Sequence, residues 1–255
     1  MAGINDQLDL FRSDYRLREK LSDRARSIRL EVRPDREVVL IYPRWVPRRE
    51  ALEFLASRDA WVREKLDEYA ARDAGNPLPP PARWDGTDEI LLRGQLVPVC
   101  VEAATLRRVQ VRVETEAITI FAPSEVCRSA HKLALVLKRE LMQRAQVDAR
   151  RMLDEEGARL GVRWTHLQIA DPQTQWGSCS ADGSISLSWR LIMVPPPAFR
   201  YVVIHELCHL VHMNHSDRFW ALVEQQMPDY LPHKLWLREH GGRLHHYLPK
   251  GQRLG

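Results

Sequence analysis

The chain carries an H-E-x-x-H pattern in His205-Glu206-Leu207-Cys208-His209, inside an apolar stretch that is compatible with a helix. Positions i and i+4 of a helix lie one turn apart on the same face, so the imidazoles of His205 and His209 can converge on one metal ion. Neutral imidazole suits zinc, and Glu206 can take a proton from water that the metal has acidified. The pattern predicts a zinc site with Glu206 as the catalytic base. The alternative is a surface helix that carries two histidines by chance.

A third histidine follows at a spacing that is typical of metalloproteases. His215 lies six residues after His209 and reproduces the H-E-x-x-H-x-x-G-x-x-H spacing of metzincins, except that His212 occupies the glycine position. Met213 and Asn214 must then turn the chain, and asparagine tolerates a left-handed conformation. His212 is a rival ligand, but a straight helix places it beyond His209 and away from an ion held by the first pair. We expect one zinc ion per chain, held by His205, His209 and His215.

Composition limits the class of protein. The chain has 255 residues, of which 44% are hydrophobic and 28% charged, and this is ordinary for a globular protein of one or two domains. No stretch approaches the ~18 consecutive apolar residues of a membrane span. The N-terminus is polar and acidic, unlike a signal peptide, and the four scattered cysteines indicate free thiols in a reducing compartment. We expect a cytoplasmic protein without a membrane partner; nothing in the sequence fixes its oligomeric state.

The charge pattern leaves nucleic acid open as a partner. The formal net charge is +4, and 32 of the 38 basic residues are arginines. An arginine-rich surface can bind nucleic acid through its phosphates. The arginines are nevertheless dispersed among 34 acidic residues, which favours an ordinary solvated surface. Nucleic acid is therefore the secondary expectation.

Hydrophobic periodicity in the N-terminal half predicts two hairpin–helix patterns on either side of a linker. Alternating apolar residues predict a hairpin over residues 27–42, and a 3.6-residue period predicts a helix over 47–71. The proline-rich stretch 74–82 predicts the linker. Beyond it we expect strands within residues 90–103 and 108–121. One long helix should follow over residues 126–160, ended by Gly161. The two hairpins resemble each other only faintly, too weakly to establish a repeat.

The C-terminal half predicts a hairpin directly before the metal helix. A short strand near 167–170 is followed by a second strand over 184–191 that alternates strictly, so Arg190 is expected on the polar face. The metal helix is expected over 198–213, and two further helices extend to about residue 240.

The segment between the two strands is a candidate wall of a substrate cleft. Zincin peptidases place a sheet before the metal helix, and an extended peptide pairs with the edge of that sheet. Gly177 and Ser178 are small enough to let another backbone approach, so we expect Trp176, Gly177 and Ser178 to bind the substrate. A tight turn in which Trp176 merely fills the core is the alternative.

Other residues near the motif are expected to be structural. Cys179 and Cys208 should pack in the interior, and Glu224 should point outward from its helix. Four tryptophans are expected to be core aromatics: Trp164, Trp189, Trp220 and Trp236. Three late histidines are expected to be solvated in a polar tail: His240, His245 and His246.

With these residues in view, the chain resembles the YgjP-type metallopeptidases, a bacterial family of zincins similar to the SprT and WLM groups. The resemblance covers most of residues 25–245 and rests on six segments: Trp176–Ser180, Ile185–Ile192, Tyr201–Leu210, Met213–Ser216, Phe219–Trp220 and Met227–Tyr230. It implies the zinc ligands His205, His209 and His215, with Glu206 as catalytic acid and base. Gln175 and Ser188 stand where a basic residue and an asparagine are expected, so details of the substrate site differ.

Together these features predict an α+β protein that hydrolyses peptide bonds with zinc. We expect a polar segment 1–24 (a short helix or loose tail), a hairpin-rich region 25–125, a zincin-like domain 126–246 with a small antiparallel sheet, and a tail 247–255. The expected partner is a peptide or protein substrate. The alternatives are an SprT-like DNA-associated protease, a nucleic-acid-binding zinc protein, and a protein whose zinc is purely structural.

Overall fold

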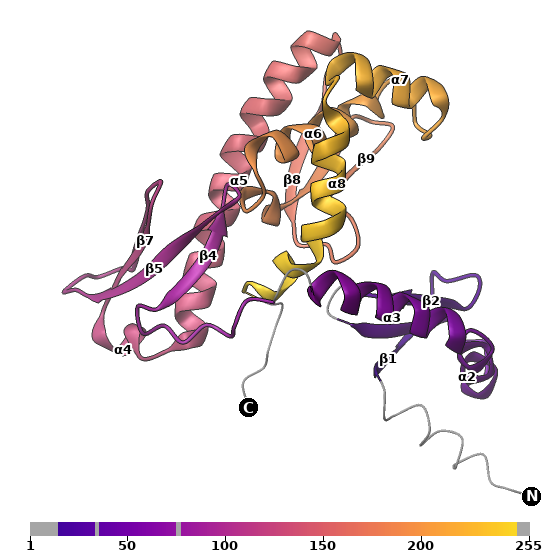
Figure 1. Cartoon of the computed structure of the whole chain (residues 1–255), viewed down its shortest axis with the longest axis horizontal. Coiled ribbons are helices and arrows are strands. Elements are labelled where there is room, and N and C mark those ends of the chain that lie inside the picture. Colours follow the sequence, from indigo (N-terminus) through magenta and orange to yellow (C-terminus); the bar gives the residue numbers. More distant parts are fainter. Residues whose placement is uncertain (1–14, 34–35, 75–77, 249–255) are drawn as a thin grey trace, which may run out of the picture. The chain divides into compact units, whose positions relative to one another are not determined.

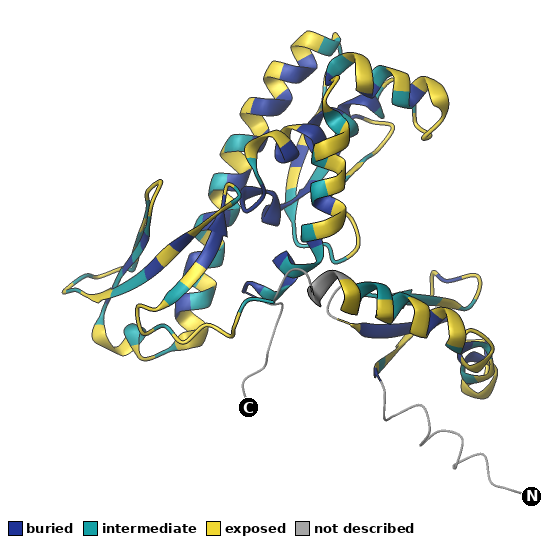
Figure 2. Ribbon diagram, viewed as in Figure 1, coloured by how far each residue is buried: buried dark blue, intermediate teal, exposed yellow. Residues whose placement is uncertain are grey.

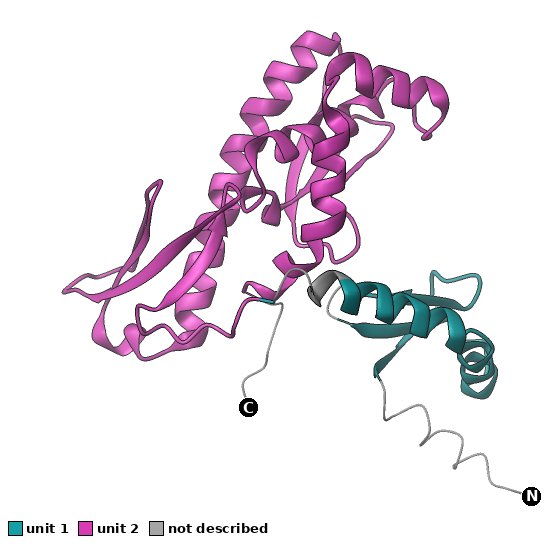
Figure 3. Ribbon diagram, viewed as in Figure 1, with its two compact units in different colours: residues 1–78 teal, residues 79–255 magenta. Residues whose placement is uncertain are grey.

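The chain divides into two compact units, residues 1–78 and 79–255, with the boundary inside the predicted linker (Figure 3). The computed structural model describes residues 15–33, 36–74 and 78–248; the first part of the predicted polar segment and most of the predicted tail lie outside these residues. Small sheets and helices occur in both units, which confirms the α+β class. Among the described residues, no helix is long and apolar enough to cross a membrane.

The first unit is a three-stranded sheet with two helices. Its elements are β1 (Arg16–Leu21), β2 (Arg29–Val32), β3 (Glu37–Tyr42), α2 (Arg48–Ser57) and α3 (Asp59–Ala74). The predicted hairpin is confirmed as the antiparallel pair β2–β3, and β1 pairs in parallel with the other side of β3. The expectation of a helix or loose tail up to residue 24 is therefore wrong for β1. Four of its six side chains are polar, as an edge strand allows, while Leu17 packs against the core of this unit.

The central strand β3 is buried along its whole length because side chains cover both of its faces (Figure 2). Its even-numbered residues pack with Leu55 and Val62 of the helices, whereas Val39 and Ile41 pack with Ala25. The helix predicted over 47–71 is divided into α2 and α3. The Ser57 hydroxyl donates to the Phe54 carbonyl at 2.8 Å, a local bond that competes with the helical pattern.

The second unit is built on the long helix α5 (Ala130–Leu160; Figure 1). Ser129 caps its first turn by accepting a hydrogen bond from the Lys132 amide at 3.4 Å, and Gly161 ends it with φ 73°. The predicted long helix and its glycine stop are confirmed. Its expected first turn is instead a separate short helix, α4 (Ser124–Cys127).

One end of α5 packs against a four-stranded sheet. In spatial order its strands are β4 (Asp88–Leu92), β5 (Gln95–Ala103), β7 (Ile118–Ala122) and β6 (Gln110–Val113). Ile118 and Ile120 belong to the same buried cluster as Leu133 of α5, so the domain boundary predicted at 125/126 would run through a single core. The pair β5–β7 is parallel beside the hairpin β6–β7, as β1–β3 is beside β2–β3. The faint echo in the sequence thus has a counterpart in topology.

The elements that follow α5 in sequence share one buried core with it and complete the second unit (Figure 1). These are β8 (His166–Ala170), β9 (Gly177–Cys179), β10 (Ser184–Ser188), η1 (Trp189–Ile192), α6 (Pro196–Cys208), α7 (Asp217–Gln226), α8 (Tyr230–His240) and η2 (Gly241–His246). The central strand β10 pairs in parallel with β8 and antiparallel with β9. The sheet expected to be antiparallel is therefore mixed, and β9 is one of its edges.

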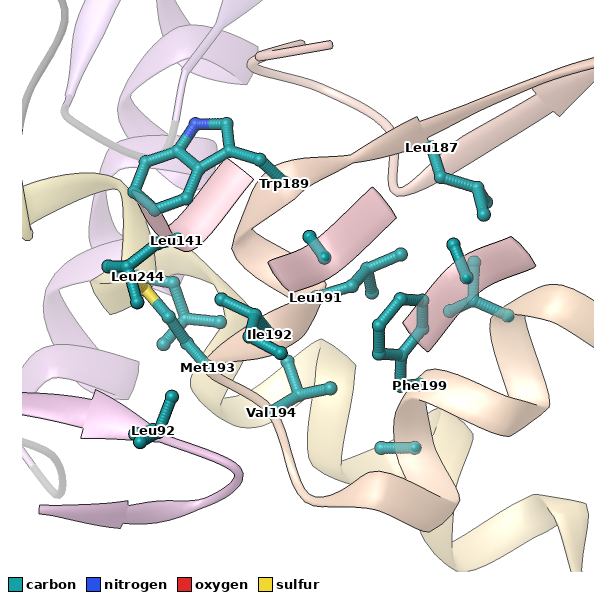
Figure 4. Close-up of a cluster of buried hydrophobic side chains, with 14 of the residues drawn as sticks. Leu92, Leu141, Leu187, Trp189, Leu191, Ile192, Met193, Val194, Phe199 and Leu244 are labelled. Atoms are coloured by element: carbon teal, nitrogen blue, oxygen red, sulfur yellow. The ribbon is translucent and has the colours of Figure 1, made fainter. Parts of the chain in front are cut away.

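The strand predicted over 184–191 ends early and turns into the core. The Ser188 hydroxyl accepts from the Arg190 amide, and the chain enters the tight turn η1. Figure 4 shows Trp189, Leu191 and Ile192 of this turn among side chains from α5, α6 and η2. The expectation that Arg190 lies on a polar face is wrong, because Arg190 is fully buried.

Arg190 is buried because its guanidinium finds polar partners in the interior. It pairs with Asp171 at 3.3 Å and donates to the carbonyls of Leu244 at 2.5 Å, Tyr247 at 2.7 Å and Leu248 at 3.3 Å. These contacts anchor η2 and the residues after it. Tyr247 and Leu248, which were predicted to lie in the tail, are buried. The expectation that the three late histidines are solvated is also wrong, because His245 is buried and His240 and His246 are half-buried.

Replacing Arg190 by methionine should destabilise the second unit strongly. The variant leaves three buried carbonyls without their donor and removes the arginine partner of Asp171, so we expect the free energy of unfolding to fall by about 3–5 kcal/mol. Urea unfolding followed by circular dichroism measures it. The matched control is Arg151→Met, since Arg151 forms only an exposed pair with Glu155 and should cost less than about 1 kcal/mol. Equal losses in the two variants would refute the anchoring role.

Candidate metal centre

Helix α6 carries the H-E-x-x-H residues and is itself part of the core. Pro196 and Pro197 occupy its first turn, where a missing amide proton costs little. The apolar side chains from Ala198 to Cys208 are buried. The helix ends at Cys208, five residues before the predicted end, and His209 is its C-terminal cap. The last amides bond to carbonyls three residues back, which tightens the end of the helix.

The early end of α6 brings three imidazoles together. One ring nitrogen from each of His205, His209 and His215 lies within 4.8 Å of the others. The Nε2 atoms of His215 and His205 are 3.0 Å apart. Two nitrogens bound to one tetrahedral zinc ion stand about 3.3 Å apart, so this donor set and its spacing fit such an ion. His205 and His209 are half-buried and His215 is exposed.

His212 stands outside this cluster, but its backbone contributes to it. The three-histidine group does not include the His212 side chain. The His212 carbonyl, however, accepts a hydrogen bond from Nδ1 of His209 at 3.1 Å. A carbonyl accepts only, so Nδ1 of His209 carries the proton and its Nε2 keeps a free lone pair. No residue from His209 to His215 has a positive φ, so the left-handed turn expected at Asn214 is wrong; the tight turns after Cys208 begin the reversal.

Two aromatic residues of α7 pack against the histidine cluster. The Phe219 ring is fully buried and lies 4.9, 4.5 and 4.8 Å from the rings of His205, His209 and His215. Trp220 stacks on His215 with ring centroids 5.7 Å apart. The sequence predicts Trp220 only as a core aromatic and gives Phe219 no place at the site. Their places four and five residues after His215, near the start of a helix, are the only local signal.

Burial decides the protonation of the groups on α6. Burial, followed by the charges of His209, His215 and then Lys234, lowers the pKa of His205 to about 3. Burial also lowers the pKa of His209, so both rings are neutral in the range where they could bind a cation. Burial raises the pKa of Glu206 to about 8. A cation beside Glu206 would favour its carboxylate form and oppose that rise.

The edge strand β9 touches the catalytic candidate. A Cβ atom on Gly177 would stand 2.5 Å from Oε1 of Glu206, so only glycine leaves room for the carboxyl in this position. Trp176 turns the other way, and its ring packs on Gly241 and lies 5.9 Å from the ring of His245. Ser178 is exposed. Trp176 therefore packs toward the core and Gly177 contacts Glu206, whereas the substrate contacts expected of this segment stay predictions.

The residues expected to be structural mostly are. Cys208 is buried, Glu224 is exposed, and burial raises the pKa of the half-buried Cys179 thiol to about 11. Trp189 is buried, whereas three other tryptophans are half-buried at the edge of the core: Trp164, Trp220 and Trp236. Of the two departures from the family pattern, Gln175 is exposed and Ser188 is buried as the cap of η1.

Comparison with known proteins identifies the family. The sequence family described as "YgjP-like, metallopeptidase domain" matches residues 26–240, whereas no curated protein matches. Among solved structures, the crystal structure of the metallopeptidase zymogen of Pyrococcus abyssi abylysin aligns with 36% of this chain and 95% of its own, at 22% identity and a TM-score of 0.34. A likeness of that size carries no argument. The family match spans most of the sequence and includes every residue of the histidine cluster. This chain therefore belongs to the YgjP-like metallopeptidase family.

Proposed function

We propose that this chain is a zinc-dependent peptidase in which His205, His209 and His215 hold one zinc ion and Glu206 is the general base. One observation supports the proposal above all. Three imidazole nitrogens converge beside a buried carboxyl, and that carboxyl lies against the edge strand β9. Three imidazoles with no thiolate or carboxylate among them favour zinc over the harder cations, and a three-ligand set leaves one position open, as catalytic zinc requires.

The protein's own residues would orient the ligands. Zinc, when bound, polarises the scissile carbonyl and acidifies the attacking water. The hydrogen bond from His209 to the His212 carbonyl fixes the tautomer whose Nε2 can bind the ion. Phe219 packs against all three rings and limits their rotation. The cluster is therefore held in a preorganised geometry.

Glu206 would move the proton during hydrolysis. Its carboxylate takes a proton from the attacking water and then delivers it to the leaving amine. Burial makes the carboxylate a stronger base than a solvated one, and a cation held by the three imidazoles would favour its ionised form. Gly177 gives the carboxyl the room to hold this position.

The edge strand β9 would bind the substrate backbone. β9 pairs with β10 on one side only, so the backbone groups on its other side are available to an extended peptide. Gly177 of this strand contacts Glu206. A peptide paired with β9 would therefore run past the carboxyl and the imidazoles. The substrate contacts proposed for Gly177 and Ser178 are mainly through backbone atoms, and Trp176 supports them from the core side.

The three histidines should differ sharply from His212 in a zinc titration. We expect His205→Ala and His209→Ala to abolish stoichiometric binding, and His215→Ala to weaken zinc affinity by more than about 100-fold, the upper range for loss of a supporting residue. His212→Ala is the control and should leave affinity nearly unchanged, because its carbonyl makes the contact. Competition with a chromogenic chelator measures each affinity. A larger loss for His212→Ala than for His215→Ala would contradict the ligand set.

Replacing Glu206 by glutamine should separate metal binding from hydrolysis. The amide cannot accept the proton, so we expect kcat/KM for peptide cleavage to fall by about 10²–10⁴-fold. Zinc content should stay at one per chain, because the three imidazoles remain. Metal analysis and cleavage of a fluorogenic peptide library on the same preparation give both values. A Glu206→Gln variant as active as the parent would refute the assignment.

A methyl group at Gly177 should displace the base without removing the metal. The added Cβ would overlap the flexible end of the Glu206 side chain, which must shift. We expect Gly177→Ala to lower kcat by roughly tenfold to a hundredfold, as small misplacements of catalytic groups do. Zinc affinity and Tm should change little. Ser178→Ala is the matched control on the same strand, and a kcat loss there as large as in Gly177→Ala would contradict the contact.

A further inference from the structure

Lys234 is an exposed cation beside the histidine cluster. Its Nζ lies 3.8 Å from the centre of the Trp220 ring and forms a cation–π contact with it. No carboxylate of the described residues forms an ion pair with Lys234. Lys138 of the same unit, by contrast, pairs with Asp171 at 2.8 Å. An aromatic face stabilises an ammonium group but leaves its hydrogen-bond donors free.

Trp220 connects this cation to the proposed zinc ligands. Its ring lies 5.7 Å from that of His215 and 5.8 Å from that of His205. On its α8 side it stacks with Tyr230 at 5.9 Å, one helical turn before Lys234. Nζ of Lys234 therefore lies within about 10 Å of the His215 ring, a span of roughly two to three extended residues. Its charge is among the causes of the lowered pKa of His205.

We propose that Lys234 and the face of Trp220 form a substrate subsite that binds a carboxylate of the peptide. The carboxylate belongs to an acidic side chain within two or three residues of the cleaved bond, or to the C-terminus of a short substrate. This inference rests on the proposed peptidase function. The free ammonium supplies the charge-assisted hydrogen bond, and the indole packs against the neighbouring methylene groups of the substrate. Leu231 and Leu235, both exposed on α8, extend the apolar surface beside it.

The test is the binding of four labelled peptides of one sequence that differ only in charge. They carry Glu or Gln at one position, each with a free or an amidated C-terminus. Binding to the zinc-loaded full chain with Glu206→Gln, which slows turnover, is followed by fluorescence anisotropy. We expect peptides with the preferred carboxylate to bind about fivefold more tightly than the fully neutral peptide, the upper range for an accessible charged pair. A preference for Glu indicates a side-chain subsite, and a preference for the free terminus indicates terminal recognition.

Variants of Lys234 assign the preference to this residue. Lys234→Met should abolish it, Lys234→Arg should restore most of it, and Lys132→Met, which removes an exposed lysine of α5, should leave it intact. Equal binding of all four peptides, or a preference that survives Lys234→Met, overturns the subsite. Cleavage by the parent chain is measured in parallel. If no peptide is cleaved but the Lys234-dependent preference is present, the peptidase proposal fails and the carboxylate site stands. If peptides are cleaved without the preference, the peptidase proposal stands and the carboxylate site fails.

Discussion

Helix α6 stops at Cys208, and the arrangement of the site depends on that stop. His209 caps the helix, and the tight turns after it reverse the chain so that His215 comes within 3.0 Å of His205. A helix that continued to Met213 would carry its later residues away along the axis at about 1.5 Å per residue. The hydrogen bond from His209 to the His212 carbonyl joins the reversal to the ligand geometry. The same short segment therefore ends the helix and orients an imidazole.

The burial of α6 serves stability and chemistry together. Its apolar side chains pack with α5, the mixed sheet and α7, which places Glu206 and His205 in surroundings of low polarity. Burial keeps the imidazole neutral and the carboxyl basic. The edge strand β9 lies over this carboxyl, with Gly177 as the point of contact. Arg190 anchors the C-terminal turn η2, and Trp176, the residue before β9, packs on that turn. The position of β9 therefore depends on η2.

Features with a strong local signal could be predicted from the sequence, whereas those fixed by distant partners could not. The histidine spacing, the long helix α5 with its Gly161 stop, and the family resemblance are all local patterns. Arg190 lies in an alternating run that indicates a polar face, and its burial depends on Asp171 and on carbonyls more than 50 residues later. β1 is mostly polar, and its pairing with β3 makes it a strand. The place of Phe219 beneath all three imidazoles likewise depends on the reversal after α6.

X-ray absorption at the zinc edge tests the central claim most directly. Zinc-loaded full chain should show three imidazole nitrogens and one further light atom at about 2.0–2.1 Å, with the outer-shell scattering of histidine rings. Two cysteine sulfur atoms could compete with the imidazoles for zinc. Cys208 is buried, and Cys179 is half-buried and close enough to Glu206 for that charge to affect the pKa of its thiol. A sulfur scatterer at about 2.3 Å, or fewer than three imidazoles, would contradict a zinc centre made of His205, His209 and His215.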